Sequence, residues 1–151
     1  MKSREIINNL LIAAAVIIIA ASCNRTGKES EPSLTGRQWI ITRVVTNESQ
    51  VAETFPEELK EISLKFNSNG IFVIEGLCNY SFGSYRSEGG KLTISDLGPG
   101  TKMLCDPFLV MQWEYLLTGD LKDSEEYNIA DNILTIKTAR SMLVFRAAEE
   151  E

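Results

Sequence analysis

The feature that most limits the fold of this 151-residue chain is a strict alternation of apolar and polar side chains on both sides of a turn. Ile62, Leu64 and Phe66 alternate with polar residues, which places the three on one face of a strand. Residues 67–70 (NSNG) then predict a turn, and residues 71–74 return as an antiparallel partner. Such a hairpin needs further elements to cover its apolar face.

Short apolar segments recur along the rest of the chain and predict a mostly β (α+β) fold. We expect further strands near residues 39–44, 80–85, 92–94, 127–129, 133–136 and 142–145, and a polar loop at residues 47–58. Seven or eight such strands cannot bury their apolar faces as a flat sheet, so we expect a strongly curled antiparallel sheet or a barrel-like closure. The expected core comprises Trp39, Leu64, Phe66, Phe72, Leu134 and Phe145.

One inserted helix is predicted near residues 106–118. Asp106 can cap it, Pro107 suits its first position, and Gly119 is expected to end it. Its apolar stripe contains Leu109, Trp113, Leu116 and Leu117.

This helix is apolar on more than one side. Phe108, Met111 and Tyr115 lie outside the stripe, so they either pack in the core or offer a docking face to another protein. Core packing is the favoured interpretation, and docking is the alternative.

The first 22 residues have the organisation of a bacterial lipoprotein signal peptide. Lys2 and Arg4 precede an apolar run at residues 10–19, and small residues then lead to Cys23. The run is shorter than the roughly 20 apolar residues that cross a bilayer, so a permanent span is the weaker alternative. We expect cleavage before Cys23 and acylation of its thiol, which anchors the protein to a membrane. An ordinary cleaved signal is the other alternative.

After the signal peptide, the sequence predicts a polar tether and a single domain. Residues 23–33 form the expected flexible, lipidated tether, and residues 34–148 form the domain. The charged residues 28–31 (KESE) resemble tags that route some lipoproteins to the cell surface. We therefore expect an anchor in the outer membrane, on its periplasmic or its surface side.

The charge of the chain limits its partners. The whole chain has a formal charge of −6, and without the signal peptide the charge is −7. This balance argues against nucleic acid and against docking of the domain itself on anionic lipid. We expect a monomer whose contacts are the lipid anchor and an envelope protein.

The chain has no histidine, which removes the commonest general base and most zinc and copper sites. We expect no catalytic residue, metal or cofactor, because the carboxylate pairs show no spacing that separates them from a solvated surface. With Cys23 acylated, Cys78 and Cys105 remain, either as a disulfide or as two buried thiols.

The segment at residues 76–85 (GLCNYSFGSY) resembles the G-x-C-N-x-x-x-G-x-Y signature of the META-domain family, which includes the HslJ-like heat-shock lipoproteins. Leu77 departs from the second small residue often found there. Agreement extends to residues 34–39, residues 101–105, Glu114, Leu117 and the closing strands at residues 134–145.

The resemblance implies a compact β-rich domain without established catalysis, in a family associated with envelope stress, heat shock and antibiotic tolerance. The side chains themselves suggest fold-defining roles. Gly76 and Gly83 suit bends or close backbone contacts, Asn79 suits bonds to turn amides, and Tyr85 suits a buried ring with a paired hydroxyl.

We therefore expect a non-enzymatic envelope lipoprotein that acts through protein contacts in envelope maintenance or stress tolerance. The alternative is a lipoprotein that carries a small ligand inside a barrel-like fold. An enzyme that uses paired carboxylates is the least supported interpretation.

Overall fold

The computed structural model describes residues 33–48, 52–54, 62–106 and 108–149, all within one compact unit, Pro32–Glu151. The expected signal peptide, Cys23 and nearly all of the tether lie outside the described residues. The elements are β1 (Gln38–Thr46), β2 (Ala52–Thr54), β3 (Ser63–Phe66), β4 (Ile71–Glu75), β5 (Ser81–Glu88), β6 (Lys91–Pro99), α2 (Phe108–Lys122), β7 (Ser124–Ala130), β8 (Ile133–Thr138) and β9 (Ser141–Ala147).

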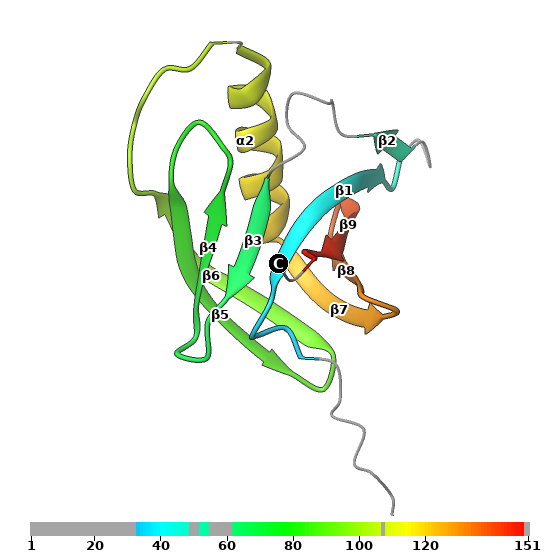
Figure 1. Ribbon diagram of the computed structural model, residues 1–151. Helices are drawn as coiled ribbons and strands as arrows, with labels where there is room; N and C mark the ends of the chain where they lie inside the picture. Colours follow the sequence, from blue (N-terminus) through cyan, green and yellow to red (C-terminus); the bar gives the residue numbers. More distant parts are fainter. Residues whose placement is uncertain (1–32, 49–51, 55–61, 107, 150–151) are drawn as a thin grey trace, which may run out of the picture. The chain divides into compact units, whose positions relative to one another are not determined.

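Eight antiparallel strands close into a barrel (Figure 1). The order is β1-β3-β4-β5-β6-β7-β8-β9, and β9 pairs back onto β1, with Val44 opposite Leu143. β2 pairs with the C-terminal half of β1, at Arg43–Val45. The expected barrel-like closure is confirmed.

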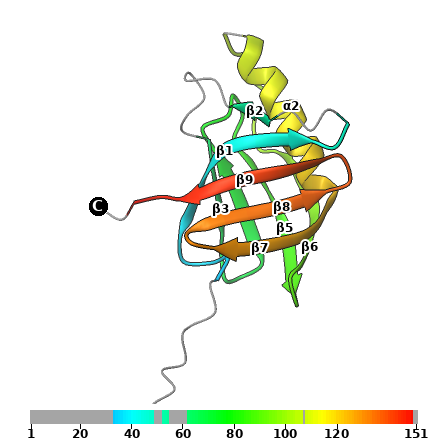
Figure 2. The ribbon, with the colours of Figure 1, turned by 90° about the vertical axis from the view of Figure 1, so that its right-hand side faces the viewer.

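The barrel interior is filled by side chains from all around the sheet. Each of the six expected core residues is buried, with at most 1% of its surface exposed. α2 packs against β6 and lies at one end of the barrel, and it adds Trp113, Leu117 and Leu121 to the same core (Figure 2). The positions of these three residues, four apart, place them on one helix face.

A bulge in β6 bends the sheet opposite Gly83. The pairing of β5 with β6 shifts between Phe82 and Ser84, and Asp96 in the extra segment has a φ of 54°. Aspartate tolerates this left-handed conformation better than most residues. Because a bulge increases local twist, it helps the strands to curl into a closed barrel.

The helix and the first loop differ from the sequence-based expectations. α2 begins at Phe108 and continues past Gly119 to Lys122, because Asp120 and Leu121 are buried against the barrel and extend the inward-facing stripe. The expected loop at residues 47–58 contains the short strand β2, whose pairing with β1 no local alternation signals. Among the described residues, no helix has the length and apolar character needed to cross a membrane.

Candidate functional site

The outward face of α2 carries the two most exposed aromatic side chains among the described residues. Phe108 and Tyr115 are 65% and 84% exposed. Together with Met111 they line a groove of about 570 Å³, called here the α2 groove. Its remaining lining residues are Gln112, Leu116, Gly119, Asp120 and Arg140. The favoured interpretation of Phe108 and Tyr115 as core residues is therefore wrong, because the inward face of α2 is already occupied by Trp113, Leu117 and Leu121.

A second cavity, of about 410 Å³, continues from the α2 groove. It shares Leu116, Asp120 and Arg140 with the groove and extends to Asn47 and Glu48 after β1. The two cavities form one surface that is apolar at the start of α2 and polar beside the β8–β9 turn.

A buried carboxylate forms the floor between the two cavities. Asp120 accepts a hydrogen bond of 2.5 Å from the Ser141 hydroxyl at Oδ2 and lies 2.9 Å from Arg140 Nη2 at Oδ1. Asp123 Oδ2 lies 3.5 Å from the same guanidinium nitrogen. Thr138 Oγ1 completes the cluster by accepting from the Ser141 amide at 2.9 Å. These bonds join the C-terminal turn of α2 to the β8–β9 hairpin.

The serine in this cluster is enclosed between α2 and the β8–β9 hairpin. Ser141 is fully buried, and the chain has no histidine to relay its proton. The cluster therefore holds the helix in place, and sequence reasoning missed it. The available signal was the position of Asp120, three residues after Leu117 on the buried helical stripe.

The family-signature asparagine holds the loop that precedes α2. Asn79 donates from its main-chain amide to Glu114 Oε2 at 2.8 Å and from Nδ2 to Glu114 Oε1 at 3.0 Å. Its Oδ1 accepts from the Met103 amide at 2.7 Å and from Thr101 Oγ1 at 3.0 Å. One buried side chain thereby connects the turn after β4, the loop at residues 101–105 and helix α2.

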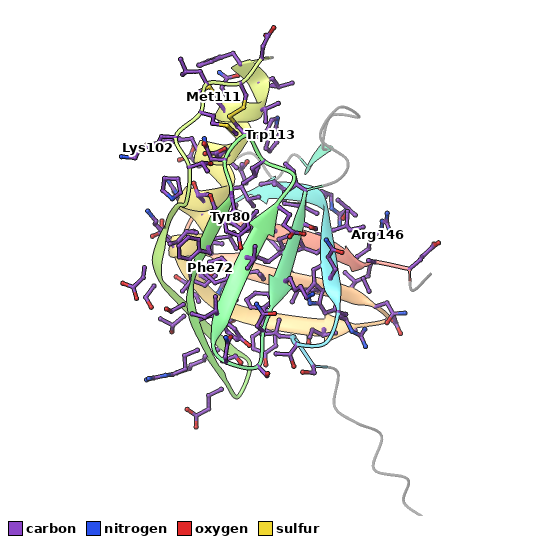
Figure 3. The ribbon with its side chains drawn as sticks, turned by 60° about the vertical axis from the view of Figure 1, so that its left-hand side comes forward. Phe72, Tyr80, Lys102, Met111, Trp113 and Arg146 are labelled. Carbon is purple, nitrogen blue, oxygen red and sulfur yellow. A yellow bond between two sulfur atoms is a disulfide. The ribbon has the colours of Figure 1, made fainter. Side chains whose placement is uncertain are left out.

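A disulfide joins Cys78 to Cys105 beside this asparagine, with the Cα atoms 5.7 Å apart. The loop at residues 101–105 is thus covalently fixed at its end and hydrogen-bonded at Met103. Figure 3 shows Lys102, Met111 and Trp113 at this end of the barrel. Between the two attachment points, Leu104 is 90% exposed.

The other signature residues are also structural. Gly76 has a φ of 84°, which favours glycine. A Cβ on Gly83 would lie 2.7 Å from the Phe72 ring and 2.9 Å from the Ser95 carbonyl oxygen. The Tyr85 ring packs edge-on against Phe66, and its hydroxyl donates to the Asn67 carbonyl at 2.7 Å. Burial, with a smaller contribution from Tyr127, raises the pKa of Tyr85.

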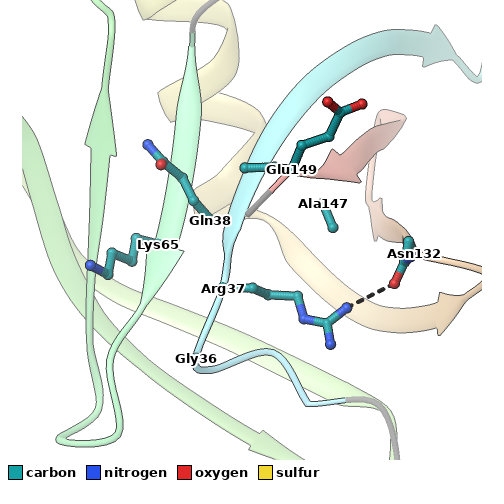
Figure 4. A pocket seen from close by; sticks show the side chains of 8 residues that line it. Gly36, Arg37, Gln38, Lys65, Asn132, Ala147 and Glu149 are labelled. Atoms are coloured by element: carbon teal, nitrogen blue, oxygen red, sulfur yellow. Dashed lines mark hydrogen bonds between the residues drawn. The ribbon is translucent and has the colours of Figure 1, made fainter. Parts of the chain in front are cut away.

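A separate polar cavity of about 610 Å³ lies where the chain enters the barrel (Figure 4). Arg37 donates to Asn132 Oδ1 at 3.0 Å, and its guanidinium lies 5.4 Å from the Trp39 ring centroid. Lys65 points away from Arg37 on the other side of β1. The two cations therefore do not converge on one point.

No group of three or more potential metal ligands occurs among the described residues. Glu125 and Glu126 are exposed and lie 3.8 Å from Lys137, as expected for solvated surface charges. Two carboxylate pairs among the described residues, Asp120 with Asp123 and Glu125 with Glu126, each share one basic side chain.

The sequence that forms this barrel matches the model of a known protein family. The META domain matches residues 32–150, which is most of the chain. The protein belongs to the META-domain family. No curated protein matches closely enough to serve as a relative.

Solved structures resemble the fold of this chain at low sequence identity. A structure from Burkholderia xenovorans determined by NMR is 19% identical, with a TM-score of 0.62, and the match covers 84% of this chain and 98% of that one. A DUF4847-family crystal structure from Bacteroides vulgatus is 10% identical, with a TM-score of 0.55 and coverages of 78% and 96%. A further NMR structure is 18% identical, with a TM-score of 0.56 and coverages of 73% and 87%. These similarities concern the fold alone.

Proposed function

We propose that this META-domain protein is an acylated lipoprotein of the cell envelope that has no catalytic role and docks a protein partner on the α2 groove. The exposure of Phe108 and Tyr115 beside Met111 is the observation that carries the proposal. Aromatic and Met side chains are the types enriched at protein interfaces. The outer membrane is the proposed location, and envelope maintenance or stress tolerance is the proposed role.

The chemistry of the groove defines the partner segment. The apolar end, at Phe108 and Tyr115, fits an apolar side chain. Glu48 at the other end is exposed and has no ion pair with any described residue, so it fits a Lys or Arg. A segment with an apolar anchor and a cation also suits the net charge of −6.

The packed barrel favours docking over the carrier hypothesis. Trp39, Phe66, Phe72 and Phe145 fill the interior and are almost completely buried. A small ligand inside the barrel would have to displace several of these side chains, at a cost of several kcal/mol. The α2 groove needs no such rearrangement.

The anchor is tested on the exported protein. Mass spectrometry of the mature N-terminus is expected to find an acylated Cys23 as the first residue. Cys23→Ala is expected to leave an uncleaved, unacylated precursor. Lipidated material from that variant would contradict the proposal.

The docking surface is tested by photo-crosslinking from full-length protein in cells that export it. A photo-reactive residue at Tyr115 is expected to give one defined protein adduct, with a crosslinked peptide that contains a basic residue. Ile133 is the matched control, because it is also apolar and exposed but lies at the start of β8. Equal adducts from both positions, or no protein adduct from position 115, would refute docking on α2.

A further inference from the structure

An apolar projection stands next to the α2 groove and shares Phe108 with its lining. Met103 and Leu104, on the loop before α2, are 56% and 90% exposed, and Phe108 follows at the start of the helix. These three residues are called here the apolar tip. A single exposed leucine is common on folded proteins and needs no explanation. A cluster of large apolar side chains on a projection instead indicates a contact site.

The apolar tip is held rigidly although it is exposed. The loop is fixed by the Cys78–Cys105 disulfide and by two bonds between Met103 and the Asn79 side chain. The Met103 amide donates to Asn79 Oδ1, and the Met103 carbonyl accepts from Asn79 Nδ2. Asn79 is in turn bonded to Glu114 on α2. Because the loop is already ordered in the free protein, binding a partner at the tip does not cost the conformational entropy of ordering the loop.

The net charge of the chain favours a protein over anionic lipid as the partner of the tip. The described chain enters the barrel at the lower end of Figures 1 and 2, whereas the tip lies at the upper end, where α2 begins. The net acidic charge opposes contact with anionic lipid.

The charged side chains beside the tip indicate which charges a complementary partner carries. Lys102 and Asp106 flank it and are both exposed, and neither forms an ion pair with a described residue. A complementary surface therefore has an apolar pocket for a branched aliphatic side chain, with an acidic group on the Lys102 side and a basic group on the Asp106 side.

We propose that Leu104 is the central anchor of the docking surface and inserts into an apolar pocket of the same protein partner that occupies the α2 groove. The inference rests on the proposed function and adds a second element to that interface. The disulfide and the Asn79 bonds, which belong to the family signature, thereby order a recognition loop.

The experiment compares photo-reactive residues at positions 104, 115 and 133 in the full-length exported protein. Positions 104 and 115 are expected to label the same identified partner, and position 133 is expected not to label it. In protein that carries the probe at 115, Leu104→Asp is expected to reduce the adduct about 30-fold, the effect of losing an interface anchor. Ile133→Asp is the matched control and is expected to change the adduct less than twofold.

The outcomes separate this inference from the proposed function. If position 115 labels a partner that position 104 does not, or if Leu104→Asp leaves that adduct unchanged, the tip is not an anchor and the α2 groove stands alone. Lipid adducts at position 104 would show that the tip contacts a membrane and would overturn the inference. Loss of protein adducts at both positions would refute both proposals. The thermal unfolding midpoint of Leu104→Asp is measured as a control and should equal that of the wild type. An unchanged midpoint shows that the variant is folded, so that a loss of labelling reports lost binding.

Discussion

The two carboxylate oxygens of Glu114 accept separate hydrogen bonds from Asn79, one from its main-chain amide at 2.8 Å and one from its side chain at 3.0 Å. This pair joins the turn after β4 to the middle of α2, although the residues are 35 positions apart. Because the same asparagine also binds Met103, the pair couples the helix to the loop that carries Leu104.

Replacing Asn79 tests this coupling. Asn79→Ala is expected to lower the free energy of unfolding by about 2–4 kcal/mol, because several buried bonds are lost at about 1 kcal/mol each and the Met103 amide loses its acceptor. Denaturant titration measures the change. Glu114→Gln is the comparison, because it keeps one oxygen acceptor and should cost less. A loss below 0.5 kcal/mol for Asn79→Ala would show that the coupling contributes little.

Removing the disulfide is expected to destabilise the domain by increasing the conformational entropy of the unfolded chain. In the chain-entropy treatment, a bridge between residues 27 apart contributes about 3.5 kcal/mol by restricting the unfolded chain. The Cys78→Ser, Cys105→Ser double variant should lose most of this amount in urea titrations. The wild-type protein in dithiothreitol should lose a similar amount, and the double variant should not respond to the reductant. A reductant effect on the double variant would assign the loss to something other than this bridge.

Local sequence patterns are enough to predict the β3–β4 hairpin and the barrel core. The alternation at residues 62–66 sets which side chains face inward, and the turn at residues 67–70 sets the register that places Phe66 opposite Phe72. Closure of β9 onto β1 depends on pairing across about 100 residues, which no local pattern encodes. Local patterns also predict an end of α2 at Gly119 that is too early, because burial against the barrel overrides the helix-ending tendency of this glycine.

The candidate site was predictable only in part. Spacing on the helix identifies Phe108, Met111 and Tyr115 as a second apolar face, but only the packed barrel decides that this face points outward. The exposure of Leu104 could not be predicted, because it results from the way Asn79 and Cys78 hold the loop. The Arg140–Asp120 pair likewise depends on the position of the β8–β9 hairpin against α2.

The close contact at Gly83 predicts a cost for even one methyl group. Gly83→Ala is expected to lower the free energy of unfolding by about 1–3 kcal/mol, because its Cβ would overlap the Phe72 ring and the Ser95 carbonyl oxygen. Gly98→Ala is the matched control on the neighbouring strand, where a Cβ meets nothing within 4 Å. Its stability should stay within about 0.5 kcal/mol of wild type. Equal effects of the two substitutions in denaturant titrations would contradict the close-packing explanation.

Within the Asp120 cluster, replacing the buried Asp120 is expected to lower the free energy of unfolding more than replacing the exposed Arg140. Asp120→Ala removes the charged acceptor of the buried Ser141 hydroxyl, which keeps only Thr138 Oγ1 at 3.1 Å, so a loss of about 2–3 kcal/mol is expected. Arg140 is 62% exposed and can be solvated when it is unpaired, so Arg140→Ala should cost about 1 kcal/mol or less. A double-mutant cycle measured by calorimetry gives the coupling between the two residues. A larger loss of stability for Arg140→Ala than for Asp120→Ala would contradict the prediction that the buried carboxylate contributes more than the exposed guanidinium.

The raised pKa of Tyr85 predicts a specific loss of stability in alkali. Burial, with a smaller contribution from Tyr127, disfavours the ionised phenol in the folded state, so the pKa of Tyr85 is higher when folded than the ordinary value near 10. The neutral phenol also donates to the Asn67 carbonyl. The stabilisation is therefore complete below pH 10 and is lost as the pH rises through the folded pKa. Tyr85→Phe should be less stable than wild type at pH 8, by about 1 kcal/mol, but its stability should fall less steeply between pH 9.5 and about 11. Tyr80→Phe, which removes an exposed hydroxyl with no hydrogen bond to a described residue, should keep the wild-type slope. Parallel slopes for wild type and Tyr85→Phe in urea titrations across this range would show that the Tyr85 proton is not linked to folding.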